Sequence, residues 1–108
     1  MATADNREPE DERLMEQLQG AVGMAEEMAL PPTERWAARR IGDDLIPALF
    51  EARTYIEVGR VAAPEIRLGL TRASLVASDL ADVDPRFAPL HSRLKVLQEK
   101  ANMAARER

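Results

Sequence analysis

A chain of 108 residues with 45% hydrophobic and 31% charged residues is long enough for one hydrophobic core and has the composition of an ordinary globular domain. The absence of cysteine excludes disulfides, thiol nucleophiles and cysteine-ligated metals, and the net charge of -4 argues against a protein that coats nucleic acids. No apolar run approaches the length of a membrane span, and the acidic N-terminus is the opposite of a secretory signal peptide, so we expect a cytoplasmic protein.

The N-terminal segment is predicted to form an acidic tail followed by a helix. We expect residues 1–8 to be disordered and residues 9–108 to form a single helical domain. A helix is predicted over 10–30, because apolar residues recur at spacings of four and three and therefore share one helix face: Leu14, Leu18, Ala21, Ala25 and Met28. Small residues on this helix, among them Gly20 and Gly23, would let another backbone come close.

A second helix is predicted over 33–59, with Thr33 as its N-cap and Gly59 at its end. Its apolar stripe repeats the same spacing: Ala38, Ile41, Leu45, Ala48 and Ala52. Pro47 lies inside this segment, where a proline removes a backbone hydrogen bond. The segment is therefore either one helix kinked at Pro47 or two helices, the later one capped by Asp44, and we favour the kinked helix.

Two further helices complete the predicted fold. The third, over 64–82, has this stripe: Ile66, Leu70, Ala73, Ala77 and Leu80. Because Leu68, Leu75 and Val76 lie outside that stripe, this helix should be the most buried one or should face a partner. The fourth, over 89–106, has the apolar residues Leu90, Leu94, Leu97, Ala101 and Ala104 on one face.

These segments favour an all-α protein. Short connections predict an antiparallel up-and-down bundle of about four helices, the second kinked or broken near Pro47. Strands are not expected, because β-branched and aromatic residues are sparse and do not alternate over a useful length. The chain has 18 alanines and 13 arginines but only 2 lysines, which indicates a GC-rich genome such as that of a bacterium or phage.

The clearest catalytic candidate is an arginine-histidine pair. Arg86 and His91 form an Arg-x-x-x-x-His spacing that resembles the ribonuclease signature of the HEPN families, which are also small helical bundles. That resemblance implies that the two side chains share a helix and act on an RNA phosphate as a dimeric pair. Pro89 lies between them and departs from this pattern. Metal-ligand spacings, a phosphate-binding loop and a nucleophile elbow are missing, so we expect no catalytic residue, no cofactor and no metal.

A cluster at the start of the second helix is the main candidate for partner binding. Arg35, Trp36, Arg39 and Arg40 combine cations with an aromatic ring, a mixture that is typical of binding surfaces. The competing interpretation, which we favour, is that Trp36 anchors the core at one end of the bundle and that the arginines beside it are simply solvated.

Basic residues elsewhere could contact nucleic acid. The first 32 residues carry eight acids and two bases, a net charge of -6, whereas the rest carry 11 acids and 13 bases, a net charge of +2. Arg93 and Lys100 are seven residues apart and share a helix face, as do Arg60 and Arg67 if their helices continue, so these four could contact phosphates. Interleaved acids favour a solvated face of mixed charge instead.

The sequence therefore favours a non-enzymatic helical interaction module: an adaptor, a regulator or an accessory subunit of a larger protein complex. Its expected partner is another protein, itself as a homo-oligomer, or both, and we expect neither a membrane nor a small-molecule substrate. The alternative is a small helical RNA- or DNA-binding subunit of a ribonucleoprotein or DNA complex. A second alternative is a HEPN-like ribonuclease that uses Arg86 and His91.

Overall fold

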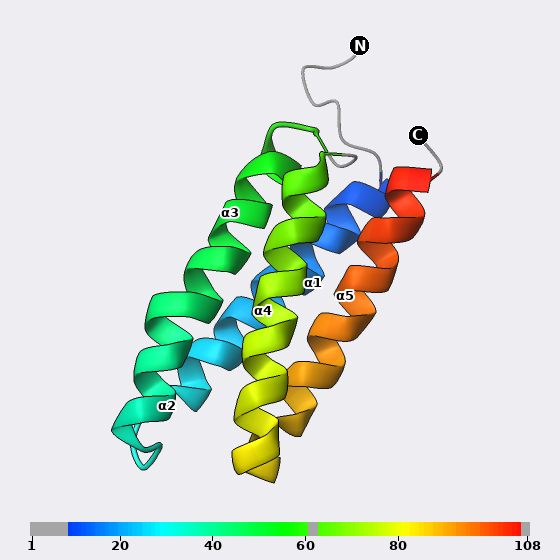
Figure 1. Ribbon diagram of the computed structural model, residues 1–108. Helices are drawn as coiled ribbons and strands as arrows, with labels where there is room; N and C mark the ends of the chain where they lie inside the picture. Colours follow the sequence, from blue (N-terminus) through cyan, green and yellow to red (C-terminus); the bar gives the residue numbers. More distant parts are fainter. Residues whose placement is uncertain (1–8, 61–62, 107–108) are drawn as a thin grey trace.

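The computed structural model describes residues 9–60 and 63–106, so the predicted disordered tail, residues 1–8, lies outside the described residues. In the described part, four helical rods run alternately up and down, which confirms the predicted all-α bundle (Figure 1). The elements are α1 (Pro9–Met28), α2 (Arg35–Arg40), the π-helical turn η1 (Ile41–Leu45), α3 (Ile46–Glu57), α4 (Pro64–Val83), the 3-10 turn η2 (Pro85–Phe87) and α5 (Ala88–Arg106). None of the described helices has both the length and the hydropathy needed to cross a bilayer.

The rods surround one hydrophobic core. α4 packs against α3 on one side and α5 on the other, and α1 packs against α3 and α5 across the bundle. Each rod supplies leucines from its predicted stripe that are almost fully buried: Leu18, Leu45, Leu70 and Leu94. The three apolar residues outside the stripe of α4 differ in burial, because Val76 is buried whereas Leu68 and Leu75 are exposed.

The second rod resolves the question posed by Pro47. The helical path continues from α2 through η1 into α3, so the predicted single helix is closer to the structure than two separate ones. The backbone N–H of Ile46 donates to the carbonyl of Ile41, five residues earlier, which widens one turn by a residue just before Pro47. Asp44 does not cap a new helix, because its carboxylate accepts a hydrogen bond from Arg40 instead.

The end of α3 follows the predicted glycine. Gly59 has a φ of 77°, a left-handed conformation that favours glycine over residues with a Cβ. The N–H of Arg60 donates to the carbonyl of Tyr55 at 2.9 Å, and the N–H of Gly59 donates to that of Ile56 at 3.0 Å. These two bonds form a Schellman motif, which satisfies carbonyls at the helix end and turns the chain out of the helix.

The start of α2 differs from the prediction. Thr33 is not its N-cap, since Glu34 occupies that position and makes no side-chain capping bond. The hydroxyl of Thr33 instead donates to the carbonyl of Met28, the last residue of α1. A carbonyl in the last turn of a helix has no partner within the helix, so Thr33 stabilises the end of the preceding helix rather than the start of the next.

Among the glycines of the described helices, the one that another backbone approaches closely is Gly69 of α4, and not a glycine of α1. A Cβ added at Gly69 of α4 would lie 2.8 Å from the carbonyl oxygen of Ala48, whereas one added at Gly23 of α1 would meet no atom within 4 Å. At Gly20 the near neighbour is a side chain, the guanidinium of Arg93. The small residue that draws two helices together is therefore Gly69, which sequence reasoning did not single out.

We expect Gly69→Ala to lower the free energy of unfolding by about 1–3 kcal/mol, because a methyl group there would force α3 away from α4. Gly23→Ala is the matched control: it lies within α1 with open space around it, so the better helix propensity of alanine should raise stability by up to about 1 kcal/mol. Chemical denaturation followed by circular dichroism measures both. Equal stabilisation by the two substitutions would show that α3 and α4 are not in close contact.

Leu70→Asp should destabilise the fold by about 4 kcal/mol or more, because it places an unpaired carboxylate in the centre of the core. Val96→Asp introduces the same group at an exposed position of α5, where a change within about 0.5 kcal/mol is expected. Thermal melting monitored by circular dichroism tests the pair. A Leu70→Asp protein that melts like the parent would mean that the buried face of α4 is wrongly assigned.

Candidate interaction surface

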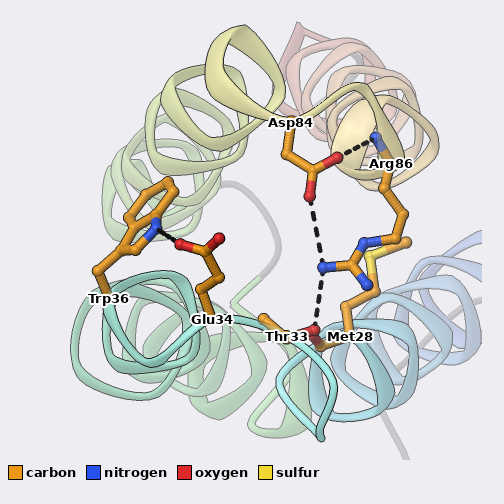
Figure 2. A network of polar contacts seen from close by, with 6 residues as sticks. All are labelled: Met28, Thr33, Glu34, Trp36, Asp84 and Arg86. Atoms are coloured by element: carbon orange, nitrogen blue, oxygen red, sulfur yellow. Dashed lines mark hydrogen bonds and ion pairs between the residues drawn. The ribbon is translucent and has the colours of Figure 1, made fainter.

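Trp36 lies on the surface of the bundle and not in its core. Its side chain is 42% exposed, and its indole N–H donates to the carboxylate of Glu34 at 2.8 Å (Figure 2). The neighbouring Ala37 takes the buried position instead. The favoured interpretation of Trp36 as a core anchor is therefore wrong. Within α2 only Ala37 is buried, so this short helix places a methyl group in the core and leaves the adjacent indole outside.

The three arginines near Trp36 differ in their surroundings. Arg40 pairs with Asp44 at 2.6 Å on its own rod and with Asp79 of α4 at 3.2 Å, so it links the second rod to α4. Arg35 and Arg39 are exposed and form no ion pair among the described residues. The predicted cluster thus contains one arginine that links two rods and two that are exposed.

A groove lined by both charged and apolar residues extends from this cluster along the outside of the bundle. A depression beside Trp36 is lined by Arg39, Arg40, Asp43 and Asp44. It shares three of these residues with a groove between the second rod and α4, whose lining is Arg40, Asp43, Asp44, Pro47, Ala48, Glu51, Arg72, Leu75 and Val76. We call the depression and the groove together the outer groove.

Leu75 and the charges around it give the outer groove its character. Leu75, which lines the groove, is 61% exposed. Ion pairs border the apolar strip: Arg72 lies 3.9 Å from Glu51, and Arg40 lies between Asp44 and Asp79. An apolar centre with a polar rim is the usual anatomy of a protein–protein interface.

The possible phosphate-binding residues do not form one stripe. Arg60 is the last residue of the Schellman motif that ends α3, so it shares no helix face with Arg67. Its guanidinium lies over the ring of Tyr55 at 5.5 Å. Arg67 is half-buried on α4. The structure therefore does not provide the continuous basic face that these two residues were expected to share.

Arg93 and Lys100 do lie on the same side of α5, and both contact α1. The ammonium of Lys100 donates to Gln17 at 3.0 Å, and the guanidinium of Arg93 lies over Gly20. Contacts of this kind cover the seam between two helices with long side chains. The predicted basic residues are thus divided between the outer groove, the loop after α3 and the α1–α5 seam.

Arg86 and His91 lie on different elements, Arg86 in η2 and His91 in α5. The N–H of Arg86 donates to Asp84 at 3.0 Å, and its guanidinium lies 3.4 Å from the same carboxylate and donates to the hydroxyl of Thr33 at 3.2 Å (Figure 2). Arg86 thereby joins the α4–α5 connection to the α1–α2 connection and closes one end of the bundle. Within the described residues, no cluster of histidine and carboxylate side chains is grouped to hold a metal ion.

We expect Arg86→Ala to lower the stability by about 1 kcal/mol, because it removes charge-assisted contacts that are partly exposed to water. Arg35→Ala, which removes an arginine without a described partner, should change the stability by less than about 0.5 kcal/mol. Denaturation curves give both values. An RNA-cleaving activity that disappears in His91→Ala and Arg86→Ala while the fold persists would contradict this structural role and support the ribonuclease alternative.

The chain matches no protein-family model, no curated protein and no solved structure. No relative therefore supplies a family, a substrate or a partner. The function has to be argued from the surface of this chain, where the outer groove combines exposed apolar side chains with a charged rim.

Proposed function

We propose that this protein is a non-enzymatic interaction module, an adaptor, regulator or accessory subunit, that holds an α-helix of a partner protein in the outer groove. The observation that supports it most directly is the exposure of Trp36 and Leu75 along one groove. Such side chains cost free energy while they face water, and they contribute most to binding when a partner covers them.

The shape of the groove favours a helix as its occupant. It lies between two rods that pack side by side, the second rod and α4, and amphipathic helices commonly bind in grooves of this kind. Leu68 and Leu75 are both exposed on α4 and are separated by seven residues, or two helical turns. A partner helix that lies along α4 would therefore meet an apolar side chain at both of these positions.

The charges in the groove suit a protein better than a nucleic acid. Asp43, Asp44 and Glu51 line it together with Arg40 and Arg72, so a phosphate backbone would meet carboxylates as well as guanidinium groups. The remaining basic candidates lie on other parts of the bundle. The nucleic-acid alternative therefore lacks a continuous basic face in the described part of the chain.

A photoreactive amino acid placed at position 75 in living cells tests the proposal. We expect a discrete adduct with a protein, resistant to nucleases, because this position lies in the groove. The control is the same probe at position 96, an exposed apolar position on α5 that should not yield that adduct. Trp36→Ala should weaken the association by more than about tenfold, since a buried tryptophan commonly dominates an interface.

Two results would contradict this function. A nuclease-sensitive adduct at position 75, together with tight and salt-dependent binding of RNA or DNA by the purified protein, would favour the nucleic-acid alternative. Failure to form any adduct at position 75, or the same adducts from positions 75 and 96, would show that the outer groove is not a specific binding surface.

A further inference from the structure

We infer that the helix held in the outer groove is α4 of a second copy of this chain, antiparallel to the first about a two-fold axis between Leu75 and Val76. This inference rests on the proposed function and names its partner. The observation that supports it is the order of apolar and charged residues along the exposed side of α4. When this order is reversed, as in an antiparallel second copy, apolar residues face apolar residues and charged residues face opposite charges.

The exposed side of α4 forms one continuous stripe. Its members follow one another at spacings of four, three, four and four residues, which keeps them on one helix face: Leu68, Arg72, Leu75, Asp79 and Val83. All five are exposed in the single chain, and the side chains of Arg72 and Asp79 are 63% and 69% exposed. We call these five residues the α4 stripe.

The α4 stripe is symmetric about its centre. Arg72 and Asp79 lie at equal distances on either side of the midpoint between Leu75 and Val76, and Leu68 and Val83 do so farther out. In an antiparallel pair of helices, residues at equal distances on opposite sides of the axis face each other. Arg72 of each copy therefore meets Asp79 of the other, each Leu68 meets a Val83, and the two Leu75 side chains meet at the centre.

Such self-complementarity is what a two-fold interface requires, because the same patch must fit itself twice. No other register of two antiparallel α4 helices pairs the charges in this way. Sliding the helices until Leu68 meets Leu75 of the second copy would place Asp79 beside Pro64, where no cation answers it. The apolar pairs and the charge pairs thus select the same axis.

The existing ion pairs of the single chain do not prevent this pairing. Arg72 lies 3.9 Å from Glu51, and Asp79 lies 3.2 Å from Arg40, but both pairs are on the surface and largely exposed. Exposed ion pairs contribute little to stability, so each side chain is available to a second partner. The neighbouring carboxylate and guanidinium also remain close enough to join a network across the interface.

The purified protein tests the inference by its mass in solution. Sedimentation equilibrium over a range of concentrations should show a reversible association to twice the monomer mass of 12.0 kDa. Arg72→Glu and Asp79→Arg should each raise the dissociation constant by more than about tenfold, because each places like charges opposite one another at two points of the interface. Arg53→Glu is the matched control, because it also places a glutamate next to a carboxylate of its own chain, Glu57. It should leave the association unchanged.

A mixture of the two variants gives the decisive measurement. When an Arg72→Glu chain meets an Asp79→Arg chain, glutamate faces arginine at one contact and Asp79 faces Arg72 at the other, so opposite charges are restored at both. Neither variant should associate with itself, and the equimolar mixture should form a dimer. Because each variant keeps its own intrachain environment in the mixture, recovery cannot come from refolding of either monomer; circular dichroism establishes beforehand that both are folded.

A protein that stays monomeric at all concentrations overturns the inference, and so does a dimer that survives both charge reversals. Failure of the mixture to associate would exclude this axis. The cellular crosslink separates this failure from that of the proposed function. An adduct from position 75 to a different protein, with a monomeric purified chain, would retain the interaction module and reject self-pairing, whereas an adduct between two copies supports both.

Discussion

The close contact between α3 and α4 is the constraint on which the candidate surface depends. Because Gly69 has no side chain, the carbonyl oxygen of Ala48 can lie 2.8 Å from the position that a Cβ would take, and the two rods pack closely there. Ala48 and Val76, which are both buried, line the groove next to exposed residues of both rods such as Glu51 and Leu75. Leu75 is exposed because it lies on the outward face of α4, together with Leu68 and Arg72, and not on the face that packs against the other rods.

The π-helical turn connects the backbone to the charges of the same groove. A proline inside a helix removes one hydrogen bond and crowds the preceding turn, and the additional residue in η1 relieves that crowding without breaking the rod. The same turn presents Asp43 and Asp44 at the groove, where Asp44 holds the guanidinium of Arg40 between itself and Asp79. The turn that accommodates Pro47 therefore also places two of the acidic residues that line the groove.

The end of the bundle that carries Trp36 is held by contacts between two connections. Thr33 and Arg86 are 53 residues apart in the chain, and their hydrogen bond joins the α1–α2 connection to η2. Phe87, which is fully buried, fills the core beneath this bond, and the guanidinium of Arg86 lies 5.2 Å from its ring. These contacts connect the residues just before α2 to η2, and Trp36 and its neighbouring arginines follow in the first turn of α2. The proposed interaction module and the proposed self-pairing through α4 both use the surface that this packing leaves exposed.

The sequence by itself determined the helices, their order and most of their buried faces, since a spacing of four and three residues between apolar side chains is a property of one helix alone. It also located the end of α3, because only the conformation of Gly59 is needed to turn the chain there. Tertiary structure decided everything that requires two elements at once. The apolar pattern of α4 could not distinguish Val76, which is covered by a neighbouring rod, from Leu75, which is not. Nor could it show that Trp36 lies outside the core, that Thr33 bonds backwards to α1, or that Arg86 closes the bundle. These outcomes depend on which side chains of other helices occupy the space around each position. Packing, rather than local spacing, determines this.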